Sequence, residues 1–293
     1  YDIFDEPKYF SPGKSPMIQE IFDKNIGLLI CEDMWAGESQ GVDPVEMLEA
    51  LSKKENQPLD LIVNLSASPF DLKKDEKRKI RASKVSKIFK CPLIYLNRVG
   101  GEDEILFDGA SFIVNENQIH LQADRFKAQA LSWDFSSKKE RLEKISADES
   151  QQSWESLFNP ELNDQSPPQL KALNEFDLER LLEALIFGMR EYARKCGFNN
   201  ALIALSGGID SALVLALARL SFPGSDDLEA LFMPSRHTGS ESFDLSYEMA
   251  KKCQIQLKNY PIKFLHSMVQ NSFGECFKNP LEGVAGENIQ SRL

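Results

Sequence analysis

Residues 201–211 read Ala-Leu-Ile-Ala-Leu-Ser-Gly-Gly-Ile-Asp-Ser, and an apolar run from Ser211 to Leu220 follows. The first five residues are apolar and partly β-branched, which is typical of a buried strand in a parallel sheet. The two glycines permit a tight turn and a close backbone approach, and the apolar run predicts a helix. Such a strand, turn and helix N-terminus gather backbone N–H groups at one point, which favours a bound phosphate.

Polar side chains in this loop suit the same ligand. Ser206 and Ser211 can donate hydrogen bonds to phosphate oxygens, and Asp210 can hold Mg²⁺, which takes carboxylate and phosphate oxygens. The loop lacks the lysine of a Walker A sequence and the third glycine of the dinucleotide fingerprint. A strand-to-helix turn without a ligand is the alternative. The predicted phosphate loop comprises Ser206, Gly207, Gly208, Ile209, Asp210 and Ser211.

Composition restricts the classes of protein to consider. The 293 residues suffice for two domains, and 27% charged with 42% hydrophobic residues is an ordinary soluble mixture. A net charge of −11 argues against a nucleic-acid partner, and no apolar run is long enough for a transmembrane helix. The five cysteines form no C-x-x-C pair. Reduced thiols in the cytoplasm are therefore expected, and a structural zinc site is not.

Residues 1–135 alternate predicted strands with helical patterns. The strands end in polar or small residues, where α/β folds place their sites. Residues 71–90 are highly charged with a thin apolar stripe, which predicts an exposed helix. The predicted strands are 25–30, 59–65 and 92–97, with a helix at 45–53 and a hairpin of 107–114 and 118–123 around 115–117.

The composition then changes. Residues 136–170 are rich in polar residues and proline, so we expect a linker. In residues 171–293, helical spacing over 176–196 precedes the phosphate-loop strand. Further predicted strands at 228–233 and 256–262 flank a helix at 242–252. This β-α-β-α-β order predicts a doubly wound parallel sheet with helices on both faces.

Cys31 directly follows the predicted strand 25–30 and stands next to Glu32 and Asp33. Two adjacent carboxylates would raise the pKa of the thiol, so a nucleophilic role requires a cation from elsewhere. The alternative is a buried cysteine that acts as a small hydrophobe. The residues alone leave both open.

The segment Gly27-Leu-Leu-Ile-Cys31-Glu32-Asp33-Met-Trp35 resembles the nucleophile strand of the nitrilase superfamily. Several further blocks of residues 1–135 resemble the glutaminase domain of the glutamine-dependent NAD⁺ synthetases. These blocks are Tyr1-x-x-Phe4-Asp5-Glu6-x-x-Tyr9-Phe10, Asn64-x-Ser66-Ala67-Ser68-Pro69, Asn97-x-Val99-Gly100-Gly101-x-Asp103-Glu104 and Phe107-Asp108-Gly109-x-Ser111.

The second half carries matching blocks. The phosphate loop resembles the pyrophosphate loop of the N-type ATP pyrophosphatases. Met233-Pro-Ser-Arg236-His237-Thr238 resembles the Met-Pro-Ser-Arg-Tyr-Thr block of the NAD⁺ synthetases, with histidine in place of tyrosine. Glu287-Asn-Ile-Gln-Ser-Arg292 resembles their Glu-Asn-Ile-Gln-Ala-Arg. The resemblance covers nearly the whole chain and implies part of a nitrilase-like αββα sandwich followed by part of a Rossmann-like adenine-nucleotide-hydrolase sheet.

The resemblance also implies site residues. Cys31 would be the nucleophile of a Glu–Lys–Cys triad whose glutamate and lysine fall before Tyr1, so the chain alone is expected not to hydrolyse glutamine. Met233 would lie near the adenine of ATP, Asp210 would hold Mg²⁺, and Arg292 would bind deamido-NAD⁺. Both chain ends read as cuts through a longer protein. The residues expected in the glutamine pocket are Tyr1, Phe4, Glu32, Ser68 and Lys74.

The implied reaction is adenylation of deamido-NAD⁺ by ATP, then amidation by ammonia from glutamine. The family commonly forms dimers or octamers, so a homo-oligomer is expected. Two alternatives stay open: another adenylating amidotransferase with this loop, and a catalytically silent nucleotide-binding module. Binding of ATP–Mg²⁺ that depends on Asp210 would separate the silent module from the enzymes.

Overall fold

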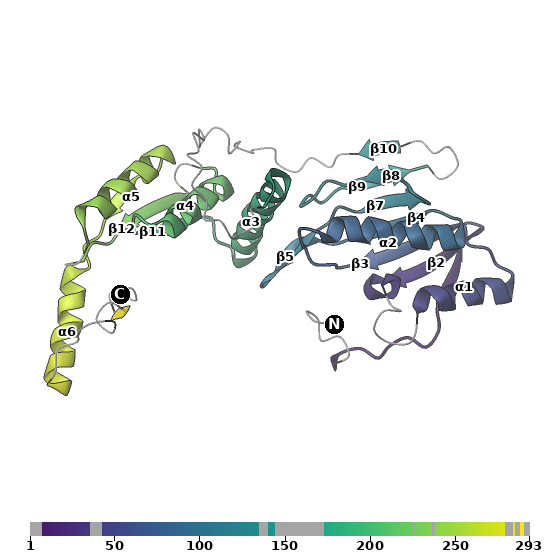
Figure 1. Cartoon of the computed structure of the whole chain (residues 1–293), viewed down its shortest axis with the longest axis horizontal. Coiled ribbons are helices and arrows are strands. Elements are labelled where there is room, and N and C mark those ends of the chain that lie inside the picture. The colour runs from purple at the N-terminus through teal and green to yellow at the C-terminus, as the bar shows by residue number, and fades with distance from the viewer. Residues whose placement is uncertain are drawn as a thin grey trace. The chain divides into compact units, whose positions relative to one another are not determined.

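The computed structural model of the 293-residue chain describes residues 8–35, 43–134, 140–143, 173–224, 227–235, 238–278, 284 and 288–289. These residues divide into two compact units (Figure 1). Described residues up to 143, together with 173–184, form the first unit, and those from 185 onward form the second. Helix α3 (Glu175–Cys196) thus carries residues of both units. The predicted boundaries at 135 and 170 stay a prediction.

The first unit is built on a six-stranded mixed sheet in the order β1-β2-β3-β4-β7-β8. Strands β2, β3 and β4 are parallel, and the outer pairs are antiparallel. The predicted hairpin is confirmed, since Asn115 pairs with Gln118, but its first strand begins at Phe112 and not at residue 107. The strands are β1 (Met17–Ile21), β2 (Lys24–Ile30), β3 (Leu61–Ser66), β4 (Leu93–Asn97), β7 (Phe112–Asn115) and β8 (Gln118–Gln122).

Shorter elements complete this unit. Helix α1 (Pro44–Glu55) begins at Asp43, whose carboxylate accepts hydrogen bonds from the first-turn N–H groups. Helix α2 (Lys74–Phe89) joins β3 to β4. Two small hairpins pair β5 (Val99–Glu102) with β6 (Ile105–Asp108) and β9 (Ala130–Trp133) with β10 (Glu140–Glu143).

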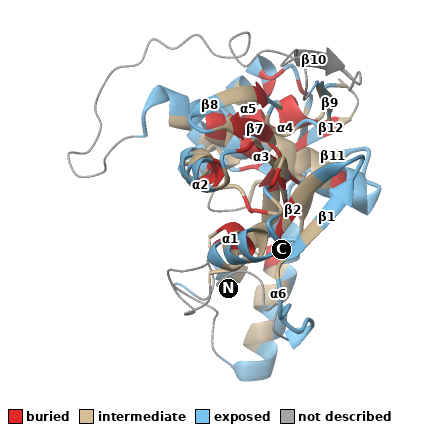
Figure 2. Cartoon of the chain, turned by 90° about the vertical axis from the view of Figure 1, so that its right-hand side faces the viewer, coloured by how far each residue is buried: buried red, intermediate tan, exposed pale blue. Residues whose placement is uncertain are grey.

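Residues that alternate along the strands of the six-stranded sheet differ in burial, and Figure 2 colours each residue by its burial. Leu29, Ile62, Leu93 and Tyr95 are buried in one core cluster with residues of α1 and α2. The alternate residues Ile30, Leu65 and Leu96 are partners in register and are 67%, 47% and 51% exposed. A row of apolar residues on the face away from the helices is what one layer of an αββα sandwich presents. The predicted nitrilase-like class therefore fits this sheet.

The second unit is a three-stranded parallel sheet in the order β11-β12-β13. Helix α4 (Ile209–Ser221) connects β11 (Ala201–Leu205) to β12 (Leu228–Phe232), and α5 (Ser240–Lys252) connects β12 to β13 (Leu257–Asn259). Helix α6 (Lys263–Phe277) follows. The buried core of the second unit includes Leu205, Leu215, Leu228 and Ala250. The predicted β-α-β-α-β order is confirmed.

Candidate functional site

Cys31 occupies a strained position at the end of β2. Its φ angle is +45°, in the left-handed region that non-glycine residues rarely adopt, and it begins a 3-10 helix over Cys31–Met34. Such a conformation costs about 1–3 kcal/mol and is concentrated at functional sites. The carboxylate of Asp33 accepts a hydrogen bond from the Ile30 N–H at 2.9 Å, which braces the turn. The half-buried Cys31 therefore sits on a sharp strand-to-helix turn, as a nucleophile would.

Asn64 supports this turn from the neighbouring strand. Its side chain is fully buried, and its Nδ2 donates to the Cys31 carbonyl oxygen at 3.4 Å. The Ser66 hydroxyl donates to Asn64 Oδ1 at 2.5 Å, which fixes the orientation of the amide. Asn64 belongs to the block 64–69 that resembles the glutaminase domain, but the sequence alone predicted no role for it.

Tyr95 lies beside Asn64 in the sheet. Its ring stacks on Phe112 with the centroids 5.0 Å apart, and its side chain is fully buried. Burial raises the pKa of the Tyr95 phenol, while the Arg78 charge and hydrogen bonds with Ser66 and Ser68 oppose that increase. Tyr95 therefore remains a neutral phenol under the polar strand ends.

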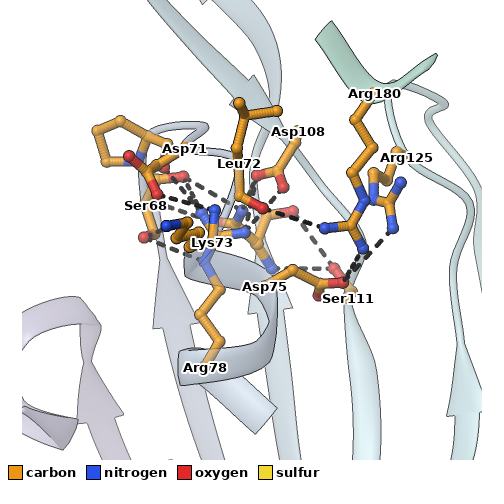
Figure 3. Close-up of polar contacts among 12 residues, drawn as sticks. Ser68, Asp71, Leu72, Lys73, Asp75, Arg78, Asp108, Ser111, Arg125 and Arg180 are labelled. Carbon is orange, nitrogen blue, oxygen red and sulfur yellow. Dashed lines mark hydrogen bonds and ion pairs between the residues drawn. The ribbon is translucent and has the colours of Figure 1, made fainter. Parts of the chain in front are cut away.

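Ser68 follows β3 and is only 3% exposed. Arg78 on α2 donates to its hydroxyl from Nε at 3.3 Å and from Nη2 at 3.1 Å, and to its carbonyl oxygen at 2.9 Å (Figure 3). Asn97, at the end of β4, accepts from the Ser68 N–H at 2.8 Å. Arg78 also forms a bidentate ion pair with buried Asp108, at 2.8 and 2.9 Å.

A second charge cluster precedes Arg78 on the same helix. Oδ2 of the buried Asp75 faces Lys79 at 3.3 Å and two arginines, Arg125 and Arg180, at 3.5 Å each. Figure 3 shows both arginines pointing at this carboxylate. Arg180 Nη1 also donates to the Leu72 carbonyl oxygen at 3.0 Å. The prediction of an exposed helix over 71–90 is thus wrong for the face that carries Asp75 and Arg78, because paired charges can be buried.

The predicted glutamine-pocket residues are only partly placed. Cys31 and Ser68 follow the ends of adjacent parallel strands, so the sheet brings their segments to the same edge. Glu32 is exposed in the 3-10 turn, and Lys74 is half-buried at the start of α2. Tyr1 and Phe4 lie outside the described residues. The pocket assignment stays a prediction.

The phosphate loop of the second unit has internal support from its own side chains. The Ser206 N–H donates to Ser211 Oγ at 3.2 Å, the Gly208 N–H donates to Ser206 Oγ at 3.2 Å, and the Ser211 hydroxyl donates to the Gly208 carbonyl oxygen at 3.0 Å. Helix α4 begins directly after, with Ile209 and Asp210 exposed in its first turn. An exposed turn at a helix N-terminus suits an incoming anion.

Two further segments meet this loop. Gly207 has φ of +82°, and a Cβ there would lie 2.7 Å from the Ser242 carbonyl oxygen in the first turn of α5. Half-buried Met233 follows β12, the parallel neighbour of β11, so it emerges at the same edge of the sheet. Arg236, His237 and Arg292 lie outside the described residues. The predicted ATP and deamido-NAD⁺ residues therefore stay predictions.

A resident metal site is not evident in the described part of the chain, where no three His, Cys, Asp or Glu side chains converge. Asp210 is one exposed carboxylate beside a loop suited to phosphate. That donor set fits Mg²⁺ only when phosphate oxygens complete the coordination, which is how Mg²⁺ is usually held.

Comparison with known proteins identifies relatives for both units. The NAD synthase family model matches residues 181–293. The glutamine-dependent NAD(+) synthetase of Synechocystis sp. is 33% identical over 296 residues, which cover 100% of this chain and 48% of the relative. The glutamine-dependent NAD(+) synthetase of Acinetobacter baylyi is 31% identical, and the match covers 100% of this chain and 48% of that relative. The solved glutamine-dependent NAD⁺ synthetase of Acinetobacter baumannii, a complex with ADP, is 28% identical with a TM-score of 0.75, covering 100% of this chain and 49% of that one.

The chain spans about half the length of the curated relatives it matches. Among the described residues, no helix is long and apolar enough to cross a membrane. The matched length includes both the Cys31 segment and the phosphate loop, as the sequence blocks predicted. The resemblance to the glutamine-dependent NAD⁺ synthetases is thereby confirmed, and residues 181–293 match the NAD synthase family model.

Proposed function

We propose that the natural protein that carries this chain is a glutamine-hydrolysing NAD⁺ synthetase. The observation that carries the proposal is the match of the entire chain to curated enzymes of that name, which takes in both candidate sites. The strained turn at Cys31 and the open loop at 206–211 supply chemistry that fits each half of the reaction.

The first half-reaction releases ammonia. The Cys31 thiolate attacks the side-chain amide carbon of glutamine, the C–N bond breaks, and the nitrogen takes a proton and leaves as ammonia. Water then hydrolyses the thioester to glutamate and restores the thiol. Asn64 and the Asp33–Ile30 hydrogen bond hold the Cys31 turn in place throughout. Tyr1, Phe4, Glu32, Ser68 and Lys74 would bind the glutamine.

The second half-reaction uses the phosphate loop. The nicotinate carboxylate of deamido-NAD⁺ attacks the α-phosphorus of ATP, and the bond to pyrophosphate breaks. Ammonia then attacks the acyl carbon, AMP leaves, and a proton passes to solvent. The N–H groups of the loop and the N-terminus of α4 would stabilise the departing pyrophosphate. Mg²⁺, held by Asp210 together with phosphate oxygens, would neutralise part of that charge. Met233 and Arg292 would contact the adenine and deamido-NAD⁺.

The test uses the natural protein with deamido-NAD⁺, ATP and either glutamine or ammonium. With glutamine, NAD⁺ formation should disappear in Cys31→Ala, while the ammonium-driven reaction should persist. Loss of activity with both nitrogen sources would contradict the division between the two sites. Absence of NAD⁺ formation by the unaltered protein with either source would reject the function itself.

Assembly and compartment belong to the same proposal. We expect a homo-oligomer, a dimer or octamer, in the cytoplasm. The five cysteines, all of which the structure describes, form no disulfide bond, which suits a reducing compartment. Exposed Phe264, Met268 and Phe277 on α6 offer apolar surface of the kind that subunit contacts cover. Sedimentation of the purified protein measures the oligomer directly.

A further inference from the structure

This inference rests on the proposed function and concerns the buried arginine of α2. Arg78 is 1% exposed, and Figure 3 shows its guanidinium between the Ser68 loop and Asp108. The sequence pattern alone predicted no role for Arg78. Its hydrogen bonds to Ser68 are more numerous than those of any other described side chain to that residue.

The hydrogen bonds of Ser68 can be counted atom by atom. Its N–H donates to Asn97 Oδ1. Its carbonyl oxygen accepts from Arg78 Nη2 at 2.9 Å and from Asn97 Nδ2 at 3.3 Å. Its hydroxyl oxygen accepts twice, from Nε and Nη2 of Arg78. Three contacts from Arg78 thus hold both the backbone and the side chain of Ser68.

We propose that Arg78 is a positioning residue for glutamine, which fixes the path of the Ser68 loop and the place of the Ser68 hydroxyl. Ser68 is the predicted glutamine-pocket residue that follows β3, so a shift of its loop would weaken glutamine binding.

The surroundings hold Arg78 in this orientation. Asp108 takes both bonds from Nη1, and Asn97 Nδ2 donates to the same Asp108 at 3.2 Å. Nη2 additionally donates to the Pro69 carbonyl oxygen at 2.9 Å. A lysine would keep the charge opposite Asp108, yet its single ammonium cannot span the hydroxyl, two carbonyl oxygens and the carboxylate as the planar fork does.

The experiment compares steady-state kinetics of the natural protein and its Arg78→Lys variant. The KM for glutamine should rise roughly tenfold or more, since hydrogen bonds to charged groups contribute at this level. The kcat at saturating glutamine should change less, and the ammonium-driven rate should stay within about twofold, because Arg78 orients binding groups only. Lys77→Met, an exposed position on the same helix, is the control and should leave all three values unchanged.

Arg78→Met combined with Asp108→Leu provides a second variant that leaves no unpaired buried charge. It should show the same selective rise in KM. An unchanged KM in a folded variant, an equal loss with glutamine and ammonium, or failure of both variants to fold would each reject the positioning role. If the unaltered protein makes NAD⁺ from ammonium but never from glutamine, the proposed function fails instead.

Discussion

The carbonyl oxygen of Ser242 lies 2.7 Å from the point that a side-chain carbon on Gly207 would occupy. The Cα of Ser242 is 2.9 Å from the same point, so the obstacle is backbone that cannot rotate aside. Gly207 also has φ of +82°, which favours glycine. The first turn of α5 and the phosphate loop are therefore built against each other.

Gly207→Ala should distort the loop and lower the ammonium-driven rate on the order of a hundredfold, a size typical of catalytic groups misplaced by about 1 Å. The control is Gly239→Ala, since Gly239 has φ of −72° and nothing within 4 Å of an added Cβ. A fully active Gly207→Ala enzyme would show that the loop is not the nucleotide site.

Asp210 gives a prediction that depends on the metal. Asp210→Ala should weaken binding of ATP in the presence of Mg²⁺ by roughly tenfold or more, because one carboxylate ligand is lost. With Mg²⁺ removed by EDTA, the variant and the unaltered protein should bind ATP alike. Calorimetry measures both conditions, with Asp244→Ala on α5 as the exposed control. Equal weakening with and without Mg²⁺ would contradict the metal role.

Asn64 should influence the nucleophile without contacting substrate. Asn64→Asp keeps an acceptor for the Ser66 hydroxyl but removes the donor to the Cys31 carbonyl oxygen. The strained Cys31 turn would then relax, and kcat with glutamine should fall roughly ten- to a hundredfold. Alkylation of Cys31 by iodoacetamide should change in rate as well.

The ammonium-driven rate of this variant should be unaffected, since the second unit is untouched. Asn25→Ala, which removes a hydrogen bond to the Pro58 carbonyl oxygen nearer the start of β2, is the matched control. Normal glutamine kinetics in a folded Asn64→Asp protein would mean that Cys31 holds its left-handed conformation without Asn64.

Local pattern was sufficient to predict the parallel strands and both site segments, but not the antiparallel strands β1, β9 and β10. The apolar runs before Cys31 and Ser206 form parallel strands, as predicted from their composition. The prediction that the strand at 201–205 is buried is wrong for its alternate residues, since Leu202 is exposed. The glycine turn at 207–208 could also be predicted, since the positive φ of Gly207 is a conformation that the absence of a side chain permits.

The burial of charged residues could not be predicted from the sequence pattern in the same way. Arg78 and Asp75 lie in a helix whose charged composition is typical of an exposed surface, and their partners are distant in sequence. Asp108 and Arg180 pair with them through tertiary packing, which periodicity does not encode. The positive φ of Cys31 has the same origin, because only the packed strand end makes that strain tolerable.

The contacts of Arg180 attach the first turns of α3 to the rest of the first unit. Its guanidinium lies 4.0 Å from the Phe176 ring centroid, donates to the Leu72 carbonyl oxygen and pairs with Asp75. Arg180→Ala should lower the free energy of unfolding by about 1–3 kcal/mol, since a buried acceptor and carboxylate lose a donor. Urea unfolding measures the change. Arg194→Ala, on the exposed end of the same helix, should have no measurable effect.

The buried thiol of Cys91 makes the free energy of unfolding depend on pH in the alkaline range. Burial raises the pKa of its thiol from 9.0 to about 12, and the nearby charge of Asp60 adds to the increase. In the unfolded chain the thiol loses its proton near its ordinary pKa, whereas the folded protein keeps it. The unfolded state therefore binds fewer protons between about pH 9 and 12, and stability falls as the pH rises through that window. Below about pH 9 the contribution is fully present.

Urea midpoints measured from pH 8 to 10.5 should fall less steeply in Cys91→Ala than in the unaltered protein, after allowing for the lower starting stability. Cys196→Ala should keep the original slope, because that thiol is exposed. A thiol reagent at pH 8 should modify Cys196 and Cys276 quickly and Cys91 only after unfolding, since a buried protonated thiol is a poor nucleophile. Rapid modification of Cys91 in the folded protein would contradict both its burial and the predicted pH dependence.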